Sequence, residues 1–174
     1  SPDKFCAELM GLSLRNVTLT VYDGDKPIFS EFGEMLFTHF GVSGPLVLSA
    51  SSHIRDMKPN RYHLAIDLKP ALDSEQLDAR IQRDFAENLN RDFINGIRKL
   101  LPAKLIPVIT RLSGIPEEQK INSVTKEQRR RFGELIKAFP VRVSGFRPID
   151  EAIVTSGGIL VREIDPHTME SKLV

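Results

Sequence analysis

The first third of the chain alternates hydrophobic and polar residues with a period of two, the pattern of half-buried β-strands. This alternation runs from Leu12 to Val21 and slips by one residue near Asn16, which predicts a β-bulge. Asp23 and Gly24 then supply a tight turn, and the strand returns through the sequence PIFSEF. These residues predict an antiparallel hairpin whose first strand is irregular.

Two more strands and a short helix are expected next. Residues 34–37 are typical of a third short strand, and residues 61–68 alternate cleanly as a fourth. Between them, Ser43, Gly44 and Pro45 precede an apolar run with helical spacing. Serine or glycine can cap a helix and proline is tolerated at its first position, so we predict a helix that begins at Pro45.

The hydrophobic period becomes helical in the middle of the chain. Asp73 with Gln76, and Thr125 with Gln128, match the capping-box pattern at a helix start. The second of these helices is expected to end before Pro140. The first carries an apolar stripe at spacing four, which consists of Leu77, Ile81, Phe85 and Leu89.

Two further helical runs are expected between the capped helices. One covers residues 91–101, and the other begins at Pro102 and ends near Gly114, because glycine favours a left-handed helix stop. Pro107 lies inside the second run and should kink or divide it. Residues 74–139 are therefore predicted to be one helical block.

Strand character returns after the helices. Apolar runs occupy residues 141–143, 153–154 and 159–164, and an Asp-Pro turn follows the last of them. The final segment has no closing cap or polar tail. We therefore expect the chain to be a piece of a longer protein.

This order of elements predicts an α+β fold. Neither group of strands has enough covered edges to fold alone, so we expect them to close into one small β-barrel. The barrel is assigned to residues 1–72 and 140–174. An interlocked all-α helical subdomain, residues 73–139, is inserted between two of its strands.

Composition narrows the class of protein without naming a function. The chain is 41% hydrophobic and 27% charged, which is ordinary for a globular domain. Its apolar runs fall short of the ~20 residues that cross a bilayer, and its net charge of +1 gives no general attraction to nucleic acid or membrane. A single cysteine, Cys6, excludes an internal disulfide. We expect a cytoplasmic protein that binds no membrane, with nucleic acid not favoured as a partner.

Ser43 lies in a sequence that is close to the nucleophile elbow of hydrolases. Gly41 to Gly44 fit the G-x-S-x-G pattern, but Pro45 takes the place of its last glycine. The later histidines occupy no recognisable partner context for a catalytic serine. We favour a helix start instead, either as a plain cap or as an N–H-rich end that faces an anion or an electron-rich ring edge.

The four histidines share no spacing that is typical of a metal site, and no metal is expected. His63 falls on the polar face of its strand. His39 lies close in sequence to the Gly-Ser-Gly turn, where a structural role is favoured over a catalytic one. No residue is assigned as catalytic.

Arg129, Arg130 and Arg131 are consecutive on a predicted helix. On a helix they spread over much of the surface, so a solvated basic face is the favoured interpretation. Contact with phosphate or nucleic acid is the alternative, but no aromatic residues lie between the arginines to stack on bases.

A Gly-Gly pair interrupts the strand-like residues near the end of the chain. Gly157 and Gly158 predict either a tight hairpin or a place where another group approaches the backbone closely. The chain contains neither G-x-G-x-x-G nor a P-loop, so it has no dinucleotide-binding fold of its own.

Two long segments, GEMLFTHFGVSGPLVLSAS (33–51) and EAIVTSGGILVREIDPHTMESKL (151–173), resemble a family of bacterial FAD-dependent oxidoreductases that includes aminoacetone-oxidase-like flavoproteins. In that family a Rossmann-like FAD domain is built from both ends of the polypeptide, with a barrel and a helical domain inserted between them. The resemblance implies that this chain is the insertion and covers substrate and flavin. It also implies that the FAD-binding domain of the same polypeptide is absent here.

The resemblance implies two groups of site residues. Thr155, Ser156, Gly157 and Gly158 match a Gly-Gly segment that lies near the flavin in related proteins. A second group, His39, Ser43, Gly44 and Pro45, matches the other signature and would face the flavin edge or the pocket of a small-molecule substrate. The expected chemistry is hydride transfer to flavin N5, with oxygen or another acceptor reoxidising the flavin and NAD(P)H as a possible partner.

FAD is expected only in the full-length parent, and none is expected on this chain alone, which should be inactive by itself. The alternative is a self-standing barrel-plus-helix module that binds RNA or a protein partner. Surface left uncovered by the FAD domain could also support a homodimer.

Overall fold

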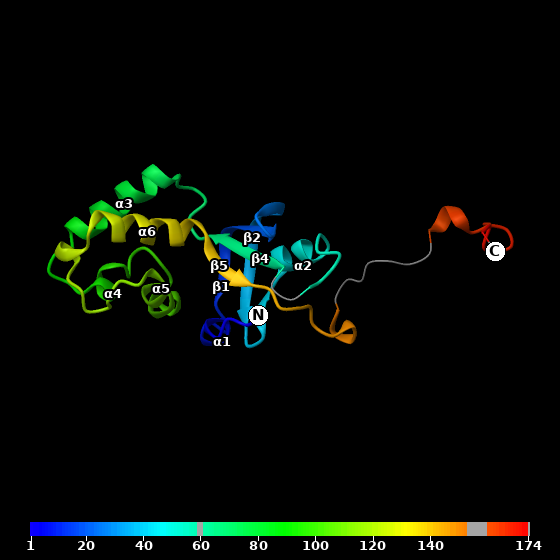
Figure 1. The fold of residues 1–174 in the computed structure, drawn as a ribbon, viewed down its shortest axis with the longest axis horizontal. Coiled ribbons are helices and arrows are strands. Elements are labelled where there is room, and N and C mark those ends of the chain that lie inside the picture. The colour runs from blue at the N-terminus through cyan, green and yellow to red at the C-terminus, as the bar shows by residue number, and fades with distance from the viewer. Residues whose placement is uncertain (59–60, 153–159, 174) are drawn as a thin grey trace.

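The computed structural model describes residues 1–58, 61–152 and 160–173. Its centre is a five-stranded antiparallel sheet with the strand order β3-β2-β1-β4-β5 (Figure 1). The strands are β1 (Ser13–Asp23), β2 (Lys26–Thr38), β3 (Gly41–Ser43), β4 (Tyr62–Asp67) and β5 (Phe139–Arg142).

Four of the helices lie between β4 and β5 in sequence and stand together beyond one end of the sheet (Figure 1). They are α3 (Ser74–Ala86), α4 (Phe93–Gly96), α5 (Ile106–Ser113) and α6 (Lys126–Lys137). Two short helices, α1 (Phe5–Glu8) and α2 (Pro45–Ser51), lie beside the sheet. Single 3-10 turns occupy Ala103–Leu105, Ile121–Ser123, Ile149–Glu151 and Val161–Glu163. The predicted α+β class is confirmed, whereas the exact domain boundaries stay a prediction.

The sheet curls into a half-barrel. The ring of Phe37 on β2 lies 6.4 Å from that of Phe139 on β5, although two strands separate them in the sheet. Phe5 of α1 packs edge-on against Phe139 at 5.4 Å, and the Asp3 carboxylate accepts hydrogen bonds from Arg142 at 2.7 Å. The segment around α1 therefore fills the space between the two edges, and β3 and β5 do not pair directly within the described residues.

The irregularity predicted near Asn16 is confirmed as a bulge. Leu14 pairs with Met35 and Val17 pairs with Gly33, so two residues of β1 face a single residue of β2. The hairpin turn is also present, with Gly24 at a φ of 58° as its first residue. A left-handed φ is accessible to glycine at little cost, which explains the residue at this position.

The local helix signals behave as predicted. Both capping boxes form, with the Asp73 and Thr125 side chains accepting from the backbone N–H of Gln76 and Gln128. Gly114 ends α5 at a φ of +70°. Pro107 divides its run as expected, because the 3-10 turn ends at Leu105 and α5 begins at Ile106.

Two strand predictions are wrong in detail. Residues 34–37 are not a separate strand, because β2 continues its ladder with β1 as far as Leu36. The described part of the run at 159–164 forms a 3-10 turn instead of a strand, since the N–H groups of Glu163 and Ile164 bond to carbonyls three residues earlier. The strand expected at 153–154 lies outside the described residues.

The helix expected over 91–101 is reduced to α4. The N–H of Phe93 bonds to the Gln119 carbonyl and that of Ile94 to the Glu117 carbonyl, so this segment pairs with a neighbouring loop instead of extending a helix. Leu89, predicted to be buried, is 50% exposed because α3 has already ended at Ala86.

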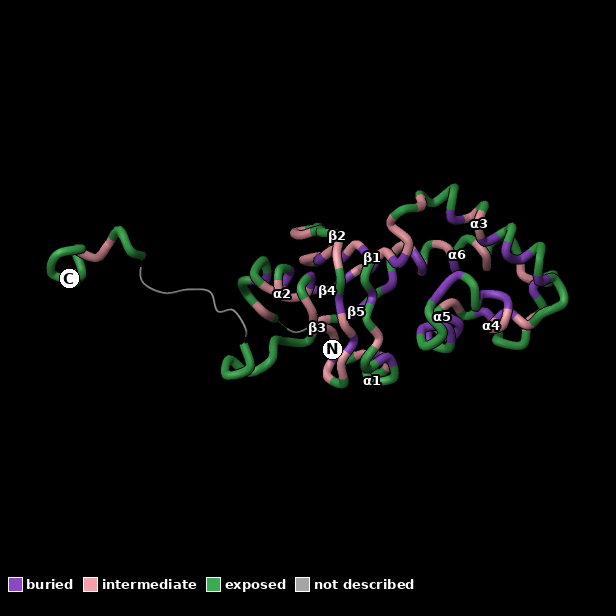
Figure 2. Tube along the Cα trace, turned by 180° about the vertical axis from the view of Figure 1, so that it is seen from behind, coloured by how far each residue is buried: buried purple, intermediate pink, exposed green. Residues whose placement is uncertain are grey.

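Buried residues continue from the sheet into the helices (Figure 2). In the helical region the rings of Phe85, Phe93 and Phe132 meet edge to face, with the last pair 5.2 Å apart. Such pairs add about 1 kcal/mol each beyond burial. Among the described residues, no helix combines the length and the apolar character that a membrane crossing needs.

Candidate functional site

The predicted pocket residues lie together where β2 turns into β3 and α2. His39 is exposed in this turn, with its ring 4.9 Å from that of Phe40. Ser43 pairs with Leu36 in the β2–β3 ladder, and Gly44 is the N-cap of α2, followed by Pro45 in its first turn. Among the described residues, no side chain caps this helix. The structure thus confirms a helix start at Pro45, whereas a pocket role for these residues stays a prediction.

Gly44 is explained by packing within the chain. Its φ is +99°, and a Cβ atom there would lie 3.1 Å from the Met35 Cα and 3.2 Å from the Leu36 nitrogen. The space that glycine leaves is therefore filled by the β2 backbone and not by an approaching ligand. Because β3 is a three-residue antiparallel edge strand, the arrangement also lacks the buried parallel strand of a nucleophile elbow.

The segment that precedes the Gly-Gly pair folds back onto the same turn. The Arg147 guanidinium lies 4.6 Å from the centre of the Phe40 ring and forms a two-point ion pair with Glu151 at 2.6–2.8 Å. Glu151, the first residue of the second resemblance segment, is thus held near the turn of the first segment at this end of the sheet. The residues expected to face the flavin lie outside the described part of the chain: Thr155, Ser156, Gly157 and Gly158.

A different surface, lined mainly by the β1 bulge and the loop after β4, contains two adjoining shallow hollows. Their volumes are about 270 Å³ and 320 Å³, and both include Asn16, Leu68 and Lys69. The first hollow also contacts residues from the β1 bulge and the loop before α5, namely Ser13, Leu14, Arg15, Val17, Leu101 and Pro102. The second also contacts Phe32, Pro70, Ala71 and Leu72. We call this pair of hollows the bulge hollow.

The bulge hollow is positively charged. Arg15 and Lys69 are its charged lining residues, and neither forms an ion pair within the part of the chain that the structure describes. The nearby carboxylate of Asp67 is already bound by Lys137 at 2.6 Å and by the Lys69 backbone N–H at 2.9 Å. Among the described residues, this acid is therefore not available as an ion-pair partner for Arg15 or Lys69.

The consecutive arginines of α6 are arranged in the opposite way, since all three are paired with acids. Arg129 bonds to Asp78 on α3 at 2.7 Å, Arg131 to Glu127 at 2.6 Å, and Arg130 lies 3.4 Å from Glu134. The Arg129 guanidinium also lowers the pKa of the Asp78 carboxyl. These contacts favour the solvated basic face over a phosphate site.

Other chemically active side chains have structural surroundings. His63 stacks on Tyr22 with ring centres 4.9 Å apart, and His53 packs against Phe29 at 4.7 Å. Cys6 is buried, and burial raises the pKa of its thiol. Among the described residues, no three His, Cys, Asp or Glu side chains are close enough together to hold a metal ion.

The described residues do not by themselves fit FAD. The sequence lacks a glycine-rich dinucleotide fingerprint, and the one close backbone approach at the helix start, Gly44, is occupied by β2. No chemical step involving flavin is therefore assigned to them.

Sequence reasoning identified the bulge near Asn16 but gave it no function. It assigned no role to the neighbouring Arg15, and it placed Phe32 in the returning strand without a function. The available signal was a large aromatic residue on the polar face of that strand, which is 59% exposed in the structure. The sequence could not show that Lys69 lies near these residues, because their proximity comes from the pairing of β1 with β2 and β4.

Comparison with known proteins defines the class. The family model described as the HI0933-like protein barrel and H2TH domain matches residues 1–154, and the chain belongs to this family. The match confirms the expected resemblance to the barrel-and-helix region of that flavoprotein family.

Three curated relatives extend this result. The chain is 29% identical over 172 residues to the ribosomal RNA dihydrouridine synthase of Haemophilus influenzae, covering 99% of the chain and 40% of that relative. It is 28% identical over 166 residues to the Escherichia coli protein with the same name, covering 95% and 38%. It is 25% identical over 158 residues to the 3-dehydro-bile acid delta(4,6)-reductase of Clostridium scindens, covering 86% and 37%. The chain therefore spans about two fifths of the length of these relatives.

Proposed function

We propose that this chain is the barrel-and-helix region of a longer, FAD-dependent reductase that acts on uracil rings in ribosomal RNA. The observation that carries the proposal is the near-complete alignment of the chain with two relatives of that named activity, over 99% and 95% of its length. The FAD-binding part would be the flanking sequence of the same polypeptide.

The third relative supports the reaction class more than the substrate. Its name describes a reductase of an unsaturated 3-dehydro-bile acid. A 3-oxo-Δ4 steroid and uracil both contain a carbon–carbon double bond conjugated to a carbonyl group. We therefore propose addition of two electrons and two protons across such a bond, with reduced FAD as the electron source. This is the reverse of the hydride direction expected from the sequence.

Within this proposal the chain has a covering and positioning role. The turn containing His39, Ser43, Gly44 and Pro45, with the segment that Arg147 holds against Phe40, forms the end of the sheet that would face the flavin domain. A flavin-facing role for Thr155, Ser156, Gly157 and Gly158 is retained as part of the proposal. Water exclusion and orientation are the contributions expected of such an inserted region.

The test uses the natural full-length protein and the ribosomal RNA of its host. The purified protein should show flavin absorbance, and with NADPH or NADH it should convert uridine in ribosomal RNA from a gene-deletion strain. Mass spectrometry of RNA fragments would detect the gain of two hydrogen atoms at a defined uridine. If ribosomal RNA from the deletion strain contained the same dihydrouridines as RNA from the parent strain, and the enzyme reduced a 3-oxo-Δ4 steroid, the RNA substrate would be rejected and a steroid-type substrate supported.

A further inference from the structure

We propose that the bulge hollow binds a single-stranded segment of RNA, with a base stacked on Phe32 and phosphates bound by Arg15 and Lys69. The choice of RNA as the ligand rests on the proposed function. The inference adds a surface of this chain that would contact the RNA. It concerns a surface other than the turn around Ser43. Along β2, Phe32 lies four residues from Leu36, which pairs with Ser43, so the two places are about 13 Å apart along the strand.

The bulge exposes two polar side chains at one point of β1. Arg15 and Asn16 lie between the paired residues Leu14 and Val17, opposite the single residue Glu34, and both are exposed. A bulge releases residues from the strand ladder and redirects their side chains. Here it places the Arg15 guanidinium at the first hollow and the Asn16 amide at both hollows.

Phe32 supplies an aromatic surface at the same place. It pairs with Thr18, which pairs in turn with Asp67 on β4, so the three side chains form one row across the outer face of the sheet. Phe32 is 59% exposed, which is unusual for so large an apolar side chain on a sheet with a packed inner face. An exposed aromatic ring beside cations is the arrangement that proteins use to stack the bases of single strands.

The charge of the hollow selects an anionic occupant. Asp67 is the acid in the Phe32 row, and its pairing with Lys137 leaves Arg15 and Lys69 free to bind phosphate oxygens. Asn16 lines the first hollow with Arg15 and the second with Lys69 and Phe32, and its amide can donate to or accept from a base edge. A purely apolar occupant would leave both cations unused.

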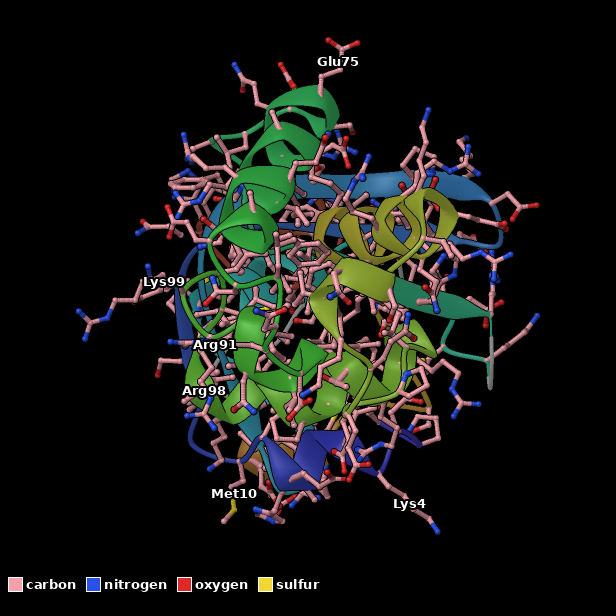
Figure 3. The ribbon with its side chains drawn as sticks, turned by 90° about the vertical axis from the view of Figure 1, so that its left-hand side faces the viewer. Lys4, Met10, Glu75, Arg91, Arg98 and Lys99 are labelled. Carbon is pink, nitrogen blue, oxygen red and sulfur yellow. The ribbon has the colours of Figure 1, made fainter. Side chains whose placement is uncertain are left out.

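More cations continue from the hollow along the helical region. Leu101 and Pro102 form part of its wall, and Arg98 and Lys99 precede them in the same loop. Figure 3 shows Arg98 and Lys99 near Arg91 on one edge of this region. Lys99 is paired with Glu87, whereas Arg91 and Arg98 form no ion pair among the described residues. A strand that leaves the hollow on this side would pass these two arginines.

The test measures binding of RNA to the natural full-length protein by fluorescence anisotropy. The probe is a fluorescein-labelled oligouridylate of about ten nucleotides. Phe32→Ala should weaken binding about tenfold, and Phe32→Tyr should restore it, because the stacking surface is retained. Arg15→Ala and Lys69→Ala should each reduce the slope of log K against log salt by about 0.7 between about 50 and 200 mM salt.

Two matched controls separate the hollow from general surface effects. Met10→Ala removes a large apolar side chain of similar exposure, 51%, and Arg131→Ala removes a cation that Glu127 already neutralises. Both should bind the probe as the unaltered protein does. Wild-type affinity in Phe32→Ala and Lys69→Ala, or equal weakening in the controls, would overturn the proposal. Circular dichroism would verify that each variant is folded.

The binding readout also separates this proposal from the proposed function. If the hollow variants lose RNA binding but neither they nor the unaltered protein form dihydrouridine, the RNA-binding site stands and the proposed reductase activity on RNA is rejected. If the hollow variants form dihydrouridine at the normal rate when RNA is limiting, the proposed reductase activity stands and the RNA-binding role of the hollow is rejected. If the flanking polypeptide occupies the hollow, all variants will bind the probe as the unaltered protein does, which also rejects it.

Discussion

The arginines of α6 and the cations of the bulge hollow carry the same charge but differ in whether an acid lies beside them. Arg129, Arg130 and Arg131 are consecutive and conspicuous in the sequence, yet each is within ion-pair distance of an acid. Arg15 and Lys69 are far apart in the sequence, and neither belongs to a motif. Strand pairing and a loop nevertheless place them beside the bulge hollow, whose lining among the described residues contains no acid. A run of like charges is therefore a poorer indicator of a binding site than two cations that lack partners.

The comparison gives the two regions different roles. The Arg129–Asp78 pair joins α6 to α3, with only 19% of the arginine side chain exposed, so it contributes to the packing of the helical region. Arg15 and Asn16 are outside the ladder and exposed, so the fold does not require their side chains. Substitutions should consequently affect stability in the first region and binding in the second.

Charge reversal should show the largest difference in stability. Arg129→Glu would place a second carboxylate beside Asp78 and should lower the free energy of unfolding by about 2 kcal/mol, between the values for exposed and buried ion pairs. Arg15→Glu, at an exposed bulge position, should change it by less than about 0.5 kcal/mol. Urea denaturation of both variants measures the two values. Equal losses would show that Arg15 also supports the fold.

A pH series should show a smaller effect. Arg129 lowers the folded-state pKa of Asp78, so this carboxylate contributes stability above its unfolded-state pKa of about 3.9. The contribution is lost as the pH falls through the folded-state value. Arg129→Ala should therefore be about 1 kcal/mol less stable than the unaltered protein at pH 7, and this difference should vanish in acid.

The matched control for this series is Arg15→Ala, which has no carboxylate partner among the described residues. Its stability should follow that of the unaltered protein across the whole pH range. A difference between Arg129→Ala and the unaltered protein that persisted below the lowered folded-state pKa of Asp78 would assign the effect to lost packing by the arginine stem, since Asp78 would then be protonated in both states.

The helices could be predicted because their signals are local. Each capping box joins residues three apart, and Gly114 needs only its own φ to end α5. The segment at 91–101 shows the limit of such signals, because its N–H groups bond to carbonyls near Gln119 that no local pattern identifies. Propensity is overridden wherever a distant segment supplies the hydrogen-bond partners.

The curl of the sheet and the bulge hollow depend on distant residues. Phe37 and Phe139 meet although the whole helical region separates them in the chain, and nothing in either strand specifies the other. Strand alternation predicted the bulge at Asn16, but its neighbour Lys69 follows a different strand. Gly44 shows the converse, since the sequence indicated a possible ligand approach and the structure fills that space with β2.

The smallest effects are expected for the two outer arginines of α6. Arg130 and Arg131 form exposed pairs with acids one helical turn away, and such pairs contribute about 0.3–0.5 kcal/mol at low salt. Arg130→Ala and Arg131→Ala should each lower the free energy of unfolding by no more than this amount. Because salt screens exposed pairs, the loss should disappear at about 1 M salt, where the Debye length is about 3 Å. A loss above about 1 kcal/mol that persists at high salt would mean that these side chains support packing, and the contrast with the hollow would then concern burial and not charge.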